Sequence, residues 1–149
     1  MRGGALSEGG GVLNHWQLLP STTALGLTWT VNDDGSISIS GKPTSAWCAI
    51  LAGNMPLSST SLYAGGEFSL SLSGAVHSVA RVTMMDGSDK SLLAPSTNKT
   101  GRATFKVPAG CKRVQFALIV QDSIGVDVSE TVHPMLNDGD EPLPYVPYL

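Results

Sequence analysis

Charged residues are scarce in this chain. They make up 14% of the 149 residues, against about 25% in an average soluble domain. The 9 Lys and Arg residues are scattered, apart from the neighbouring pair Lys112 and Arg113, and the formal net charge is −3. A protein that binds the phosphates of nucleic acid needs clustered basic side chains. The sequence therefore predicts no nucleic-acid partner.

Long apolar runs are also missing. No stretch approaches the roughly 20 apolar residues that cross a bilayer, so we expect no membrane partner. The first residues carry one basic side chain and no apolar segment, and they do not resemble a cleaved signal peptide. We predict that residues 1–13, with five glycines between Gly3 and Gly11, form a flexible lead-in. Residues 14–149 are then the folded domain.

Cysteine is rare as well. Cys48 and Cys111 lack the CxxC spacing of a metal or redox site and have no neighbouring histidine. A disulfide between them is one alternative. We favour two small buried apolar side chains, which free cysteines commonly are. A domain of this length buries roughly 70% of its unfolded surface, so it does not depend on a covalent link to fold.

Signatures of catalysis are missing too. The sequence has no GxSxG, phosphate-binding or dinucleotide-binding motif. His15, His77 and His133 do not have the spacing of a metal site, and most carboxylates fall in predicted turns. A hydrolase needs an activated nucleophile or two carboxylates that share a cleft. We therefore expect that the protein is not an enzyme.

One acidic segment has a composition that suits calcium. Asp138, Asp140 and Glu141 surround Gly139 in a predicted turn, and calcium takes loop carboxylates and carbonyls as ligands. The segment lacks the full spacing of a recognised calcium loop, so we favour a solvated turn. The expectation is no cofactor, with calcium as the alternative.

What the sequence does contain is alternation of apolar and polar residues, the pattern of strands with one buried face. Leu27, Trp29 and Val31 share one face of a first run, and residues 36–40 alternate in a second. The Asn-Asp-Asp-Gly string between the two runs suits a tight turn, because Asp-Gly tolerates positive φ angles. These residues predict a β-hairpin.

The same alternation recurs along the chain. Further strands are predicted at 46–51, 67–73, 79–84, 102–107, 113–120 and within 126–136, with a long polar loop at 86–101. Eight short strands separated by turn residues, without a helical pattern, are typical of a sandwich or barrel. We predict an all-β fold, an antiparallel β-sandwich of the jelly-roll type with about eight strands.

Motifs at both ends of the chain and in the hairpin resemble a known family. They are Asn14-His-Trp-Gln-Leu-Leu-Pro-Ser21, the hairpin Thr28–Gly41, Val132-His-Pro-Met-Leu-Asn-Asp-Gly139, and Pro144-Tyr-Val-Pro-Tyr148. These segments are similar to domains associated with phage and prophage tails, which resemble galactose-binding, carbohydrate-module jelly rolls. The resemblance covers nearly the whole chain from Asn14 to Tyr148. It implies a location in the virion tail, or a prophage-encoded protein in a bacterial cell.

Carbohydrate binding offers the clearest candidate residues. Sandwiches that bind sugars use an aromatic platform together with polar side chains that bind hydroxyls. The candidates are Trp16, Trp47, Tyr63, Arg81, Thr83, Arg102, Arg113 and Gln115. Strand parity places the polar candidates of 79–84 and 113–120 on the face opposite the core, where they would line a polar surface if the two strands share a sheet. An ordinary solvated sheet face is the alternative, and we favour it.

The remaining aromatic residues have mixed assignments. Trp29 shares a face with Val31 and is predicted to be core, and Trp47 lies in a run that is apolar on both faces, which favours core over platform. The tail 142–149 is too rich in proline for a central strand, so we expect an extended segment over the sandwich. Tyr145 and Tyr148 would bury their rings there and keep their hydroxyls in water.

The sequence thus predicts a protein that binds a ligand or has a structural role, and that does not catalyse a reaction. The first hypothesis is a tail structural or receptor-binding module, whose partners are host surface carbohydrate or other virion tail proteins, with homo-oligomerisation left open. The second is a carbohydrate-binding module of a cell-wall-acting protein. The second requires a solvent-exposed tryptophan or tyrosine, whereas burial of both Trp16 and Trp47 would favour a structural role.

Overall fold

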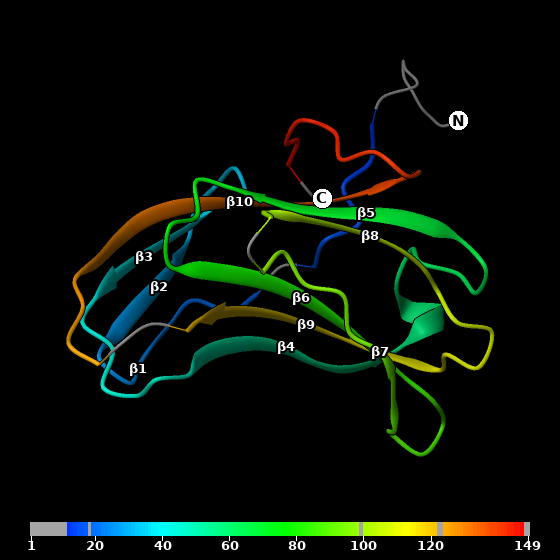
Figure 1. Ribbon diagram of the computed structural model, residues 1–149, viewed down its shortest axis with the longest axis horizontal. Coiled ribbons are helices and arrows are strands. Elements are labelled where there is room, and N and C mark those ends of the chain that lie inside the picture. The colour runs from blue at the N-terminus through cyan, green and yellow to red at the C-terminus, as the bar shows by residue number, and fades with distance from the viewer. Residues whose placement is uncertain (1–11, 18, 99, 122–123, 148–149) are drawn as a thin grey trace.

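The computed structural model describes residues 12–17, 19–98, 100–121 and 124–147, and these form two stacked antiparallel sheets (Figure 1). The six-stranded sheet has the order β1-β2-β3-β10-β5-β8 and the four-stranded sheet the order β4-β9-β6-β7. The elements are β1 (Thr22–Ala24), β2 (Leu27–Val31), β3 (Ile37–Gly41), β4 (Cys48–Pro56), η1 (Leu57–Ser59), β5 (Glu67–Ser73), β6 (Ser78–Met85), β7 (Ser91–Leu93), β8 (Arg102–Lys106), β9 (Arg113–Val120) and β10 (Val128–Asp138). The predicted all-β sandwich is confirmed.

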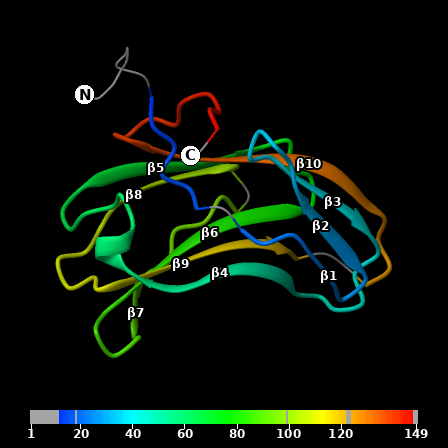
Figure 2. The same cartoon turned by 180° about the vertical axis from the view of Figure 1, so that it is seen from behind.

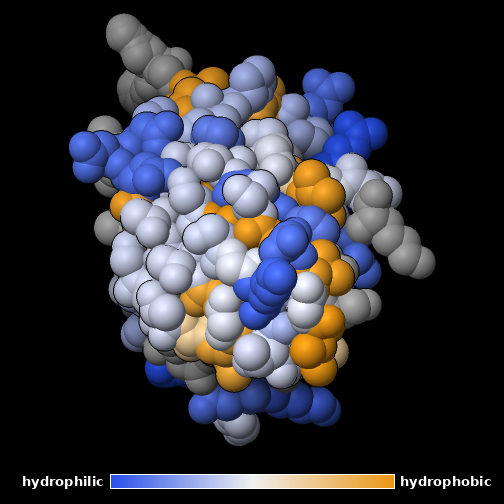
Figure 3. Space-filling view, turned by 90° about the vertical axis from the view of Figure 1, so that its left-hand side faces the viewer, coloured by the Kyte–Doolittle hydropathy of each residue, from blue (hydrophilic) through white to orange (hydrophobic). Residues whose placement is uncertain are grey.

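The described part of the chain contains a single short helical turn, η1. Within it, no helix is long and apolar enough to cross a membrane. Figure 2 shows η1 at one end of the molecule and the strands β1, β2 and β3 at the other. Seen from that second end, hydrophobic side chains form separate patches among weakly hydrophilic ones (Figure 3).

The predicted hairpin is formed by β2 and β3. Trp29 is paired with Ile39, and both side chains are buried between the sheets. Gly35 adopts a φ angle of 84°, which a residue with a Cβ atom rarely adopts. The Asp34 carboxylate accepts hydrogen bonds from the hydroxyl and the N–H of Ser36, and these bonds hold the pKa of Asp34 below its usual value. The Asn-Asp-Asp-Gly string therefore forms the turn that its composition predicts.

Two short strands were not predicted, and each lies at the edge of a sheet. β1 is the outermost strand of the larger sheet, and β7 is the outermost strand of the smaller one. None of their side chains is buried. Because these strands bury no side chain, they leave no apolar alternation in the sequence.

Strand β10 connects the two halves of the larger sheet. Its first half, Val128–Val132, pairs with β3, and its second half, His133–Asp138, pairs with β5. Each half therefore has one side without a neighbouring strand. The N-terminal segment covers the open side of the second half, where the N–H of His15 donates to the carbonyl of Leu136 at 2.7 Å.

Asn14 completes that cover with one side chain. Its Oδ1 accepts the N–H groups of Trp16 and Leu136, both at 3.0 Å. Its Nδ2 donates to the carbonyls of Pro134 at 2.9 Å and Val146 at 2.8 Å. The opening asparagine, the Pro-Met-Leu segment and the C-terminal tail are therefore one hydrogen-bonded unit, which gives a physical reason for the three motifs to occur together.

The C-terminal tail lies over the sandwich as an extended segment, as predicted. The Tyr145 ring is half-buried and packs edge-on against His133, with ring centroids 5.0 Å apart. Its hydroxyl is not left to water as we expected, because it donates to the carbonyl of Asp34 at 2.5 Å. Burial raises the pKa of Tyr145 to about 12. The prediction for Tyr148 falls outside the described residues.

Tyr145 is expected to make stability depend on alkaline pH. Its pKa is about 12 in the folded chain and about 10 in an unfolded one. The folded chain keeps the proton more strongly, so the contribution of Tyr145 is complete below pH ~10 and falls as the pH approaches ~12. Melting curves of the wild type and Tyr145→Phe should therefore converge over that range. A difference in melting temperature that stays constant across it would contradict the assignment.

Candidate functional site

The smaller sheet presents a polar outer face. Strands β6 and β9 are neighbours, so the predicted polar residues of both strands do share one sheet. Val82 and Phe116 point into the core and are fully buried, while Thr83 and Gln115 are directly paired and half-buried on the opposite face. The parity assignment made from the sequence is therefore correct.

Trp47 immediately precedes β4 and lies on this same face. The prediction that favoured the core was wrong, because the side chain is 44% exposed. The guanidinium carbon of Arg81, on β6, lies 5.3 Å from the centroid of the indole ring. The Nε atom of Arg81 is buried, so we place the guanidinium beneath the indole, whose outer surface faces solvent.

The contact between Arg81 and Trp47 lies over β9, because β9 is the strand between β4 and β6. Ala117 and Ile119 of β9 belong to the outer face, yet each is only 1% exposed. Leu51, paired with Ala117, is half-exposed on the same face. The cation–π contact thus holds a wide aromatic ring over an apolar floor, next to polar side chains.

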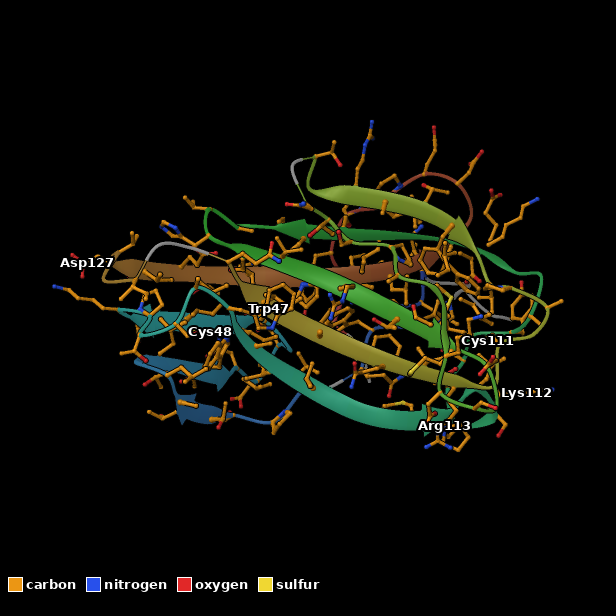
Figure 4. All side chains as sticks on the ribbon, turned by 60° about the horizontal axis from the view of Figure 1, so that its bottom comes forward. Trp47, Cys48, Cys111, Lys112, Arg113 and Asp127 are labelled. Carbon is orange, nitrogen blue, oxygen red and sulfur yellow. The ribbon has the colours of Figure 1, made fainter. Side chains whose placement is uncertain are left out.

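Arg113 lies at the far end of this face. Pairing places Cys48 opposite Val120 and Pro56 opposite Arg113, so Trp47 and Arg113 are separated by the length of β9. Figure 4 shows the two side chains at these separate positions. The Nε atom of Arg113 forms an ion pair with Asp89 at 3.3 Å. Arg113 is therefore engaged with the β6–β7 loop, away from the platform.

The β6–β7 loop is ordered by hydrogen bonds to the carboxylate of Asp86. Asp86 accepts the N–H groups of Ser88 at 2.8 Å and Lys90 at 3.0 Å. The hydrogen bond from the N–H of Lys90, and to a smaller extent that from Ser88, holds the pKa of Asp86 below its usual value. A carboxylate used in this way shapes the turn formed by residues 86–89.

Three candidates lie outside the outer face. Trp16 is 2% exposed in the core and packs edge-on against Phe116, with centroids 5.3 Å apart, so it cannot be a binding platform. Tyr63 is exposed, but it packs against Phe68 of the larger sheet. Arg102 begins β8, also in the larger sheet. Sequence reasoning could not separate these residues from Trp47, because chemical type does not specify which sheet a residue joins.

The two cysteines are free and buried, as we favoured. They lie at opposite ends of the smaller sheet (Figure 4), which explains why no disulfide joins them. Burial raises the pKa of the Cys111 thiol. A buried thiol with a raised pKa is a packing residue and a poor nucleophile.

The acidic segment near the C-terminus is used for hydrogen bonding. Asp138 accepts from His15 Nε2 at 2.9 Å, and the carbonyls of Asp140 and Glu141 accept from the side chains of Thr104 and Asn137. Within the described residues, no three His, Cys, Asp or Glu side chains converge on one point that could hold a metal ion. Asp138 is the last residue of β10, and Asp140 and Glu141 are exposed in the segment that follows it.

His15 joins two further side chains in a way that the sequence did not indicate. Its Nδ1 lies 2.5 Å from the hydroxyl of Ser61, and its Nε2 lies 2.9 Å from the carboxylate of Asp138. The imidazole is 6% exposed and edge-on to Phe68. The arrangement contains the residue types of a hydrolytic triad, but the buried imidazole sits against core atoms, so we interpret it as a clamp between the N-terminal segment and β10.

Two cavities add to the surface features. One of about 370 Å³ lies where β6 begins, between the β5–β6 turn and the segment that follows β7. Another, broader one of about 1010 Å³ lies beside β8 and is lined by Arg102, Thr104, Asp140 and Glu141 among others. The first cavity is lined by residues of both sheets, Leu72 of β5 and Val79 of β6 among them, whereas the second belongs to the larger sheet.

The sequence matches no family model and no curated protein. In fold, the chain is similar to a structure of accessory secretory proteins 1, 2 and 3 in Streptococcus pneumoniae, with 16% identity, a TM-score of 0.54, and 86% of this chain and 96% of that chain covered. It is also similar to the glycosylation-associated Gap123 complex from Streptococcus agalactiae, with 14% identity, a TM-score of 0.56, and 85% and 44% covered. A structure of carbohydrate-binding modules from the β-sandwich superfamily aligns at 10% identity with a TM-score of 0.42, over 71% and 50% of the two chains. The first two likenesses show that the chain has a known β-sandwich fold.

Proposed function

We propose that this protein is a non-enzymatic carbohydrate-binding module of a phage or prophage tail, which attaches the virion to a glycan on the host surface. The outer face of the smaller sheet is the binding surface. One observation carries the proposal: the half-exposed indole of Trp47 is held over that face by Arg81. The phage setting rests on the resemblance of the terminal and hairpin motifs.

The chemistry of this face suits a sugar ring. An indole buries the apolar face of a sugar and loses little conformational entropy, because it has only two side-chain torsions. Arg81 further restricts the ring before any ligand arrives, which lowers the cost of ordering it on binding. Thr83 and Gln115, directly paired beside it, offer the donors and acceptors that hydroxyl groups need.

The second candidate uses the same surface in another setting. A module of a cell-wall-acting protein would bind polysaccharide through the same exposed tryptophan, which that hypothesis requires. The two candidates differ in the protein that carries the module. Surface glycans of intact bacteria would be bound in the first case, and isolated cell-wall polysaccharide in the second.

Replacing Trp47 with alanine is expected to weaken glycan binding by about 10- to 100-fold, since an aromatic anchor at a binding face commonly contributes that much. The measurement is a glycan array with purified protein, with calcium and with chelator, followed by titration of the strongest ligands. Arg81→Ala should weaken the same ligands by a smaller factor. Tyr63→Ala is the matched control, because it removes an exposed aromatic side chain that packs against the other sheet.

Two outcomes would count against the proposal. Equal loss in Trp47→Ala and Tyr63→Ala would place the site elsewhere. No binding to any glycan, with or without calcium, would favour a structural role in the tail, in which the polar face is an ordinary solvated surface.

A further inference from the structure

The cavity at the start of β6 has the composition of a site for a neutral polyol. Its volume of about 370 Å³ is within the range of small-ligand sites. Its polar lining includes His77, Thr97, Asn98 and Gln121, and none of the described residues that line it is Asp, Glu, Lys or Arg. Amides and hydroxyls both donate and accept hydrogen bonds, as sugar hydroxyls do, whereas an anionic ligand would require a fixed positive charge.

Two side chains in this cavity are available to a ligand. The side-chain amides of Asn98 and Gln121 make no hydrogen bond within the described part of the chain, and both residues are exposed. Thr97 is buried, and its hydroxyl oxygen accepts the N–H of Ala80 at 3.0 Å, which leaves its proton to donate. The cavity thus combines one fixed hydroxyl with two amides that have no partner among the described residues.

One wall of the cavity is firmly anchored to β10. The Glu130 carboxylate accepts the N–H groups of Val76 and His77 and the hydroxyl of Ser78. Gly74, with a φ angle of 83°, lies so close to β10 that a Cβ atom there would be 2.2 Å from the carbonyl oxygen of Thr131. The β5–β6 turn is therefore held in place before any ligand binds, and Glu130 is a positioning residue for this wall.

The cavity is adjacent to the Trp47 platform. Cys48, Val120 and Ser78 lie on one rung of the smaller sheet, and their side chains point into the core. Trp47 and Gln121 each stand one residue beyond that rung, so they share the outer side of the sheet. The strands β4 and β6 are separated by β9 alone, a distance of roughly 10 Å. This separation is comparable to the length of a disaccharide.

From this arrangement we propose that the cavity binds the terminal residue of a neutral glycan whose next residue stacks on Trp47. The inference rests on the proposed function, which it refines by specifying a neutral chain end as the ligand. The segment around Thr97 and the β5–β6 turn close the cavity on two sides, so a chain that crosses β9 from Trp47 ends there. The engaged Glu130 carboxylate behind the wall disfavours an acidic sugar in the same position.

Nuclear magnetic resonance can observe the two parts of the site separately. The side-chain amide signals of Asn98 and Gln121 and the indole N–H signal of Trp47 would be assigned with the variants Asn98→Asp, Gln121→Glu and Trp47→Phe. The probes are glucose, galactose, mannose and N-acetylglucosamine, their linear di- and trisaccharides, and N-acetylneuraminic acid. We expect both amide signals and the indole signal to shift with one neutral series, and not with the acidic sugar.

Affinity then tests the terminal position. Asn98→Ala and Gln121→Ala should each weaken binding of the responding disaccharide about 3- to 10-fold, as expected for one lost hydrogen bond. Glu130→Gln should weaken binding of the same disaccharide, because the β5–β6 turn that forms one wall of the cavity would be held less firmly. A melting curve will show whether that variant remains folded. Asn32→Ala, in the distant β2–β3 turn, is the control that should leave the affinity unchanged.

The outcomes distinguish this inference from the function on which it rests. An indole shift without amide shifts would overturn the cavity assignment and leave the Trp47 platform standing. Amide shifts without an indole shift would overturn the joint site. No shift of either kind with any neutral probe would overturn the inference, whereas the proposed function would fall only if the glycan array also showed no binding.

Discussion

An alanine in place of Trp16 is expected to lower the free energy of unfolding by about 3–5 kcal/mol, the usual cost of removing a large buried aromatic side chain. Trp16 is 2% exposed and packs against Phe116, which is fully buried on β9. The substitution would leave a cavity between the N-terminal segment and the smaller sheet. In a domain of this size, the melting temperature should fall by roughly 10 °C.

Trp47→Ala is the matched control, because it removes the same side chain from a half-exposed position. Its effect on the melting temperature should be a small fraction of that of Trp16→Ala. Trp16→Phe should recover much of the loss, because the indole N–H of Trp16 has no hydrogen-bond partner among the described residues. A Trp16→Ala protein as stable as the wild type would show that the N-terminal segment is not part of the core.

Asn14→Ala is the second substitution with a large expected effect. It removes four hydrogen bonds, of which three join the N-terminal segment to β10 and the tail and one lies within that segment. The buried N–H of Leu136 would lose its partner, and an unsatisfied buried group costs about 1–3 kcal/mol. With the other bonds partly replaced by water, we expect a loss of about 2–4 kcal/mol.

Chemical denaturation measures this loss, and hydrogen exchange at Leu136 tests its origin. Asn98→Ala is the control, because it makes the same change at an exposed side chain that makes no hydrogen bond within the described residues. Protection of the Leu136 amide should fall in Asn14→Ala and be retained in the control. Unchanged protection in both variants would mean that β10 does not depend on this cover.

The sequence predicts those strands whose side chains are sorted between core and solvent. Hairpin β2–β3 and strands β5, β6, β8 and β9 all alternate, and all were found close to their predicted bounds. Strands β1 and β7 bury no side chain, so only tertiary pairing reveals them. The alternation of apolar and polar residues thus identifies strands that contribute side chains to the core, and it does not identify edge strands that contribute none.

The candidate site was predictable in part. Parity placed Arg81 and Gln115 correctly, because their strands alternate cleanly. Parity failed at Trp47, because Ala49 and Leu51 make the outer face of β4 as apolar as its inner face. The cavity could not be predicted at all, since it joins segments around Ala75, Thr97 and Gln121 that only the fold brings together.

The bond between Asn14 and Val146 also has a mechanical consequence. It places the points where the chain enters and leaves the sandwich beside each other, 2.8 Å apart between side-chain nitrogen and carbonyl oxygen. A pull applied through these two residues would load that bond first, before the two sheets are sheared. While the bond holds, the domain adds almost no length to a tether. Once the bond breaks and the sheets unfold, the intervening chain could extend by roughly 450 Å. The Asn14 side chain would therefore set the force at which this extension begins.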